Sequence, residues 1–178
     1  MRKLLLASLM VAVLAFGVAA ATTDSDTSTF GVGNEEMAVI ACSGDAGNLL
    51  LIAPAAGAIP AAVNTSASLT YLQYTVVVGT TTKEITAQIT TGPLPTGTLL
   101  KITTIPDGGG LEGSAVSDTS VTTGSAVDVI TAIPSCATGV GGTDGASVEW
   151  ELSVSDITDM DLHASADITV TFIITDTS

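Results

Sequence analysis

The stretch that decides the fold class lies between residues 83 and 90 and reads Lys-Glu-Ile-Thr-Ala-Gln-Ile-Thr. Its apolar residues Ile85, Ala87 and Ile89 alternate with polar ones. Successive side chains of a β-strand point to opposite faces, so this alternation places one face on a core and the other in water. The stretch therefore predicts a strand of an antiparallel sheet.

The same alternation recurs in residues 148–154 and 167–175, and weaker strand patterns fill the chain between turns rich in Pro and Gly. Residues 36–42 and 48–53 are apolar enough to predict strands buried on both sides. We expect one domain, residues 36–178, with an immunoglobulin-like antiparallel β-sandwich of about seven to nine strands. Alternation predicts these residues in or near the core: Ile85, Ile89, Trp150, Leu152, Ile168, Val170 and Phe172.

The first 21 residues have the three parts of a secretion signal. Met1-Arg2-Lys3 is positively charged, residues 4–18 are apolar, and Ala19-Ala20-Ala21 offers the small residues at which a signal peptidase cleaves. The apolar run is too short for a stable membrane span. We expect residues 1–21 to be cleaved and the protein to be secreted, extracellular or held at the cell surface.

The charge balance excludes whole classes of partner. The chain has 18 acidic and 4 basic side chains, and Arg2 and Lys3 lie in the signal. Phosphate contacts need Lys and Arg, so we expect no binding to nucleic acid or to an anionic membrane surface.

Two cysteines, Cys42 and Cys136, suit an oxidising compartment. Pairing would close a loop of about 94 residues and restrict the unfolded chain strongly. We expect a Cys42–Cys136 disulfide; the alternative is two unpaired thiols. Neither cysteine has a basic neighbour in the sequence that would lower its pKa, which disfavours a reactive thiol.

Residues 22–35 form a polar N-terminal segment whose only bulky apolar residues are Phe30 and Val32. Alone, the segment cannot bury enough apolar surface to offset the entropy lost on ordering. One interpretation is a flexible terminus. The other is a strand that becomes ordered on a neighbouring subunit, with Phe30 and Val32 as anchors on alternate positions.

Three aspartates, Asp156, Asp159 and Asp161, lie close together in the sequence and offer oxygen ligands for calcium. Their spacing matches no EF-hand, and the glycine of such loops is missing. The alternative is a solvated acidic loop, so calcium is the one cofactor for which the sequence gives any indication.

Catalysis is not indicated. His163 is the only histidine, and no Gly-x-Ser-x-Gly nucleophile motif is present. Glu149 and Glu151 share the outward face of one predicted strand, and glycosidase clefts need more aromatic residues than this chain has. Tyr71, Tyr74 and Trp150 can stack on a sugar, but a core position is the alternative for Trp150. Asn64 begins an Asn-Thr-Ser glycosylation sequon.

Three stretches carry a resemblance: residues 83–105 (KEITAQITTGPLPTGTLLKITTI), residues 127–152 around Ser135-Cys136-Ala137-Thr138-Gly139, and residues 166–176 (ADITVTFIITD). Together they resemble a group of uncharacterised secreted all-β proteins of bacteria. With the signal and an apolar strand ending in Cys42-Ser43, the chain is distantly similar to fimbrial and spore-coat-U-type (pilin-like) subunits. That resemblance implies a sandwich completed by a neighbour's strand, and assembly into a surface fibre. The cysteines of those families lie much closer in sequence, and no assembly motif of theirs is present.

These observations predict a non-enzymatic structural protein of the cell surface or extracellular space, such as a self-assembling pilin-like subunit forming a homo-oligomer or filament. The alternative function is a soluble extracellular module that binds carbohydrate, protein or calcium. It would use loops at one end of the sandwich, for which residues 106–113, 134–145 and 155–163 are the candidates.

Overall fold

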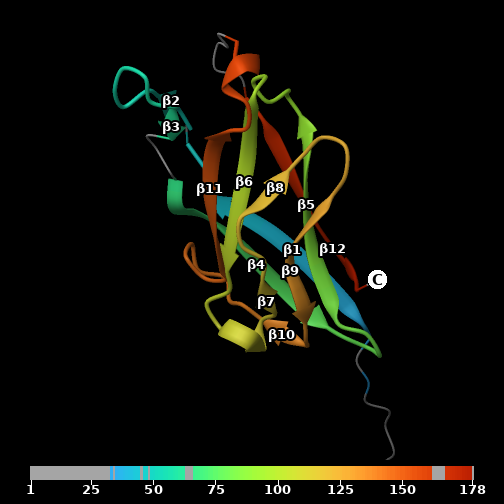
Figure 1. Ribbon diagram of the computed structural model, residues 1–178. Coiled ribbons are helices and arrows are strands. Elements are labelled where there is room, and N and C mark those ends of the chain that lie inside the picture. Colours follow the sequence, from blue (N-terminus) through green and yellow to red (C-terminus); the bar gives the residue numbers. More distant parts are fainter. Residues whose placement is uncertain are drawn as a thin grey trace, which may run out of the picture. The chain divides into compact units, whose positions relative to one another are not determined.

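The alternating stretches form strands in the computed structural model, which describes residues 33, 35–44, 46–47, 49–62, 66–161 and 167–177 (Figure 1). Residues 35–178 form one compact unit. The strands are β1 (Met37–Gly44), β2 (Leu51–Ile52), β3 (Ala61–Ala62), β4 (Ser66–Val77), β5 (Lys83–Thr91), β6 (Thr98–Ile105), β7 (Ser114–Ala115), β8 (Thr119–Val121), β9 (Val127–Ile133), β10 (Cys136–Ala137), β11 (Ala146–Val154) and β12 (Thr169–Asp176). Two 3-10 helices, η1 (Gly109–Leu111) and η2 (Ile157–Asp159), lie in loops.

The strands form two main sheets and one small hairpin, and every pairing is antiparallel. The first sheet has the order β1-β4-β11-β6-β8, with β10 also paired to β4. The second has the order β12-β5-β9-β7, and β2 pairs with β3. This confirms the predicted all-β, antiparallel class.

The chain changes sheet at almost every connection after β4. Strands β4, β6, β8, β10 and β11 belong to the first sheet, and β5, β7, β9 and β12 belong to the second. In an immunoglobulin constant domain the sequence neighbours A and B, D and E, and F and G share a sheet. The connections of this protein are therefore different from those of that domain.

One apolar core lies between the two sheets. Its buried members include Leu72, Val76, Ile102 and Val148 of the first sheet, and Ile85, Ile89, Val129 and Ile130 of the second. Of the predicted core residues, Ile85, Ile89 and Trp150 are buried. Leu152, Ile168, Val170 and Phe172 are half-buried. Val170 and Phe172 lie on an edge strand, where the core is covered from one side only.

Two predictions of burial are wrong. Residues 36–42 were expected to be buried on both sides, but β1 is an edge strand with mostly exposed side chains. Residues 48–53 contribute only β2, which pairs with β3 outside the main sheets. Apolar composition predicted a strand in each case, but it did not predict how many neighbours that strand has. No helix among the described residues is long and apolar enough to cross a membrane.

Candidate functional site

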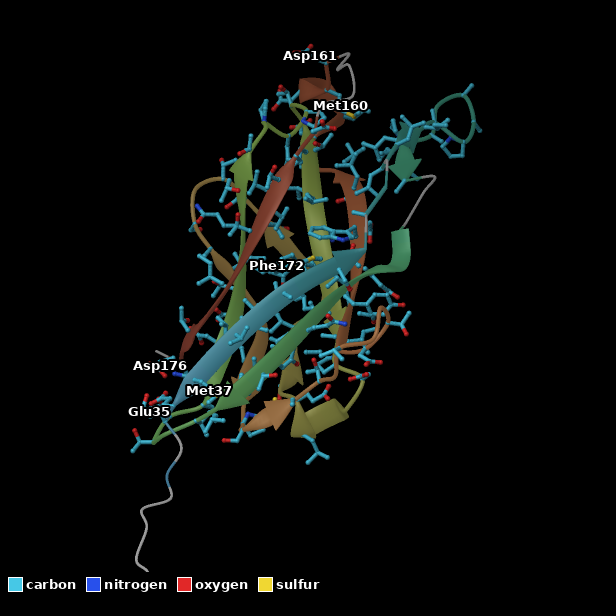
Figure 2. All side chains as sticks on the ribbon, turned by 180° about the vertical axis from the view of Figure 1, so that it is seen from behind. Glu35, Met37, Met160, Asp161, Phe172 and Asp176 are labelled. Atoms are coloured by element: carbon cyan, nitrogen blue, oxygen red, sulfur yellow. The ribbon has the colours of Figure 1, made fainter. Side chains whose placement is uncertain are left out.

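The most distinctive surface of the described residues is the side on which both sheets end in an unpaired edge. Strand β1 pairs only with β4, and β12 pairs only with β5. The two edge strands also contact each other. Figure 2 shows them together, with Met37 and Asp176 at the same end. Each edge strand has a row of backbone N–H and C=O groups that no described strand pairs with.

The core-facing side chains of these two strands are incompletely covered. Residues directly opposite in an antiparallel pair share a face, and Ala38, Ile40 and Cys42 lie opposite the buried Val76, Tyr74 and Leu72. In β12, Val170, Phe172 and Ile174 lie opposite the buried Ile89, Ala87 and Ile85. Ala38 and Cys42 are nevertheless exposed, and the other four are half-buried. We call these six side chains the open seam: Ala38, Ile40, Cys42, Val170, Phe172 and Ile174.

The central part of each edge lacks the devices that usually protect an edge strand. Natural proteins block exposed edges with charged residues, prolines or bulges. Strand β1 has eight residues, none charged and none proline. Strand β12 has no charged residue before its last position, Asp176, and its one irregularity lies at its start, between Thr169 and Val170. Long, uncharged, apolar edges of this kind are templates for pairing with another chain.

One end of the open seam is closed by an ionic cluster. The Lys83 ammonium forms salt bridges with Glu36, just before β1, and with Asp176 of β12, the latter at 2.6 Å. Lys83 is only 7% exposed. Hydrogen bonds to Asp176 and Glu36 raise the pKa of Lys83, and the bond from Lys83 lowers the pKa of Asp176. The cluster ties both edge strands to β5.

Sequence reasoning missed this cluster, although the signal for it was present. Lys83 has the same parity in its strand as Ile85, Ala87 and Ile89, so alternation places it on the apolar face. A lysine on a buried face needs a paired carboxylate. Alternation could not show which of the 18 acidic residues would supply it.

The aromatic side chains expected to stack on a sugar are mostly in the core. Tyr74 is 2% and Trp150 is 6% exposed, and only Tyr71 is half-buried. The Tyr74 hydroxyl donates to the Glu112 carbonyl at 2.7 Å, and the Trp150 indole N–H donates to Thr70 Oγ1 at 3.2 Å. These three residues therefore do not form a sugar platform, and the alternative of a core position for Trp150 is confirmed.

The structure contradicts the predicted disulfide, because Cys42 and Cys136 are free and lie on opposite sides of β4. Cys42 lies opposite Leu72, and Cys136 lies opposite Val76. Two strand spacings and four residues along β4 separate the Cα atoms by about 16 Å. A disulfide allows at most about 7 Å. Burial raises the pKa of both thiols, and the Glu112 charge adds to the effect at Cys136.

The three aspartates of the candidate calcium site do not converge. Asp156 caps η2, where its Oδ1 accepts from the Thr158 backbone N–H at 2.8 Å and from Thr158 Oγ1 at 2.7 Å. These hydrogen bonds lower the pKa of Asp156. Asp159 and Asp161 are exposed. Among the described residues, no group of three or more His, Cys, Asp or Glu side chains is arranged to hold a metal ion.

The three candidate binding loops lie at two different ends of β6. Ser155 donates its backbone N–H to Gly97, directly before β6, whereas residues 106–113 directly follow β6. The eight residues of β6 separate these points by about 26 Å. Residues 106–113 and 134–145 do meet, because Gly145 donates its backbone N–H to Asp107 Oδ2 at 3.2 Å.

That shared end of the loops has a pair of interacting carboxyl groups, Asp107 and Glu112. Burial and the hydrogen bond to Asp107 raise the pKa of Glu112, whereas the bond from Glu112 lowers the pKa of Asp107. Glu112 Oε2 also accepts from the Gly108 backbone N–H at 2.9 Å. Burial and the nearby charges of Glu112, Cys136 and Asp107 raise the pKa of Tyr74.

Several predicted features lie outside the described residues: the signal, Phe30, Val32, Asn64 and His163. Comparisons of the chain with family models, with curated proteins and with solved structures find no match.

Proposed function

We propose that the protein is a non-enzymatic structural subunit that is exported and self-assembles at the cell surface or outside the cell. The open seam is the observation that carries this proposal. It combines two adjacent edges that no described strand pairs with and a row of apolar side chains that face the core and are incompletely covered. The two antiparallel sheets around one core support an immunoglobulin-like sandwich in its layers, with strand connections of its own.

The chemistry of the open seam suits an added strand. An extended peptide that joins a sheet edge gains main-chain hydrogen bonds, and its alternate side chains enter apolar sites. The β1 and β12 edges offer the hydrogen-bonding groups, and Ile40, Val170 and Phe172 line the apolar sites. No charged residue of either strand stands in the way before Asp176.

The N-terminal segment of a neighbouring copy is the strand we propose for the open seam. Phe30 and Val32 are two residues apart, so both point to one side of an extended strand. Burying two such side chains contributes about 3–6 kcal/mol, less than most estimates of the cost of association, about 4–15 kcal/mol. Main-chain hydrogen bonds along the edge must therefore supply part of the affinity.

The test is to remove the segment and observe assembly. The chain from residue 22 should form oligomers or filaments, measured by light scattering after size exclusion and by negative-stain microscopy. Deletion of residues 22–34 keeps Glu36 for its salt bridge with Lys83. The deletion should leave a folded protein with an unchanged circular dichroism spectrum that forms no filaments.

A matched pair of substitutions sharpens the test. Phe30→Asp puts a charge on the side of the segment that enters the open seam, and Thr29→Asp puts the same charge on the opposite side. Phe30→Asp should stop assembly, and Thr29→Asp should permit it. Equal assembly by both variants would show that this segment does not occupy the seam.

A soluble binding module remains the second proposal, favoured by one contact. The hydrogen bond from Gly145 to Asp107 brings residues 106–113 and 134–145 together, as a loop-based site requires. Calorimetric titration of the monomer with calcium and with soluble oligosaccharides tests it. A binding heat that is lost in the Asp107→Ala variant would support a site at this end of the molecule. The absence of a binding heat with calcium and with every oligosaccharide would count against a calcium or carbohydrate site.

A further inference from the structure

The charges of this chain leave one long region neutral. Asp45 is the only charged residue between positions 37 and 82, although the chain has 18 acidic residues and a net charge of −14. The region contains β1, the β2–β3 hairpin and β4. In the described structure these elements therefore form neutral surfaces on an otherwise acidic protein.

The β2–β3 hairpin, residues 49–62, is the most apolar part of this neutral region, and we call it the apolar hairpin. Leu49 packs against the core, but Leu50 is 53%, Ile52 49% and Ile59 63% exposed. Strand β3 contacts β11, and Figure 1 shows the hairpin beside one end of that strand. Exposed apolar clusters of this kind mark interaction sites in soluble proteins.

A second neutral surface lies on the outer face of β1 and β4. The register places Met37 opposite Val77, Val39 opposite Thr75, and Ala41 opposite Gln73. All six side chains point away from the core, because Ala38, Ile40 and Cys42 point toward it. Met37 is 44% and Val39 is 62% exposed. We call this surface the neutral strip; beyond β4, the outer face of β11 carries Glu149 and Glu151.

We propose that the apolar hairpin of one copy docks on the neutral strip of a second copy. Two acidic copies repel each other wherever their carboxylates face across a contact. The hairpin and the strip both carry exposed apolar side chains and no charged ones, so they allow close contact between copies without that repulsion. The two basic residues in the described part of the chain, Lys83 and Lys101, are already paired with carboxylates within one copy.

This contact is separate from the open seam, although it rests on the proposed self-assembly. The open seam uses the core-facing side of β1, and the neutral strip uses the outer side of the same strand. Hairpin and strip are different surfaces, so their contact is heterologous unless two copies exchange hairpins reciprocally. A heterologous contact that does not close into a ring continues from copy to copy, as a fibre requires.

The test places charges on both surfaces and measures self-association by sedimentation velocity over a range of concentrations. Ile59→Asp and Val39→Asp should each weaken association about tenfold or more, because each buries a carboxylate at the contact. Leu111→Asp is the matched control, since Leu111 is 78% exposed in η1 and belongs to neither surface. It should associate like the parent. The three positions are exposed, so circular dichroism should show folded protein throughout.

A charge-pair variant excludes a trivial loss of solubility or fold. The double variant Ile59→Asp/Val39→Lys should associate more strongly than either single variant, because opposite charges then meet across every contact. Association of Ile59→Asp equal to that of the parent would overturn the inference. If Ile59→Asp associates like the parent but deletion of residues 22–34 stops assembly, only the hairpin–strip contact is overturned and the proposed function stands. A parent that stays monomeric at every concentration overturns both the contact and the proposed function.

A lipid surface is the other occupant that the experiment can reveal. Flotation with vesicles of zwitterionic phosphatidylcholine tests it with the same variants. Flotation of the parent that Ile59→Asp abolishes, together with unchanged self-association, would contradict docking on a second copy.

Discussion

The ring of Phe172 meets the indole of Trp150 edge to face, with the ring centroids 6.1 Å apart and the planes at 62°. The contact joins β12 of the second sheet to β11 of the first. Trp150 is buried and fixed by its hydrogen bond to Thr70, whereas Phe172 is only half-buried. Phe172 therefore belongs to the open seam and at the same time contacts Trp150 in the buried core.

Truncation of Phe172 should destabilise the protein. Phe172→Ala removes the edge-to-face contact and part of the apolar packing, and we expect a loss of about 2–3 kcal/mol in the free energy of unfolding. Urea denaturation followed by Trp150 fluorescence measures it. Ile173→Ala is the control, because Ile173 is exposed on the opposite face and should change stability by less than about 0.5 kcal/mol.

The Lys83 cluster predicts loss of stability at both extremes of pH. The pKa of Asp176 is lowered by folding, so its contribution is present above the ordinary carboxyl pKa and is lost as pH falls through the lowered value. The pKa of Lys83 is raised, so its contribution is lost as pH rises through the raised value. The measurement is the urea midpoint of unfolding as a function of pH. The fall of the midpoint at acid pH should be reduced more by Asp176→Asn than by Asp118→Asn. Asp118 pairs with the more exposed Lys101; an equal reduction by both variants would contradict the account.

Glu112→Gln should stabilise the protein at neutral pH. The raised pKa of Glu112 means that its contribution is present at low pH and is lost as pH rises through that value. An amide keeps the oxygen that accepts from Gly108 and always offers an N–H to Asp107. The urea midpoint of the variant should exceed that of the parent at pH 7 and approach it at pH 4. A lower urea midpoint of the variant at pH 7 would show that the ionised carboxyl pair of Asp107 and Glu112 does not destabilise the protein at that pH.

Both cysteines should react as thiols without a reductant. Their separation across β4 prevents an intramolecular disulfide in the folded chain. Intact mass after denaturation in iodoacetamide should show two adducts per chain with or without prior reduction. Two adducts only after reduction, in a protein that is monomeric before it, would show that the strands around β4 are arranged differently.

Alternation predicted most of the strands because it depends only on neighbouring residues. Residues 83–90 and 148–154 lie within β5 and β11, and the alternating stretch 167–175 forms most of β12. Whether Cys42 and Cys136 can form a disulfide depends instead on which strands lie on either side of β4, and alternation does not predict that. Two cysteines in strands look alike in sequence whether those strands are adjacent or separated by a third.

The open seam was predictable only in part for the same reason. The sequence indicated that β1 and β12 are apolar strands, but not that both are edges or that they lie beside each other. Residues 48–53 are apolar enough to predict a buried strand, yet Leu50, Ile52 and Ala53 are exposed because the hairpin packs beside β11 outside the two main sheets. The strands that pair with a given strand are determined by the fold of the whole chain, so a local sequence pattern does not predict them.

The measurement that tests the central claim most directly is light scattering coupled to size exclusion on the chain from residue 22, with and without residues 22–34, and negative-stain microscopy of the same fractions. We expect regular oligomers or filaments for the longer chain, and a folded protein that forms no filaments for the shorter one. A folded monomer for both at high concentration would contradict the central claim.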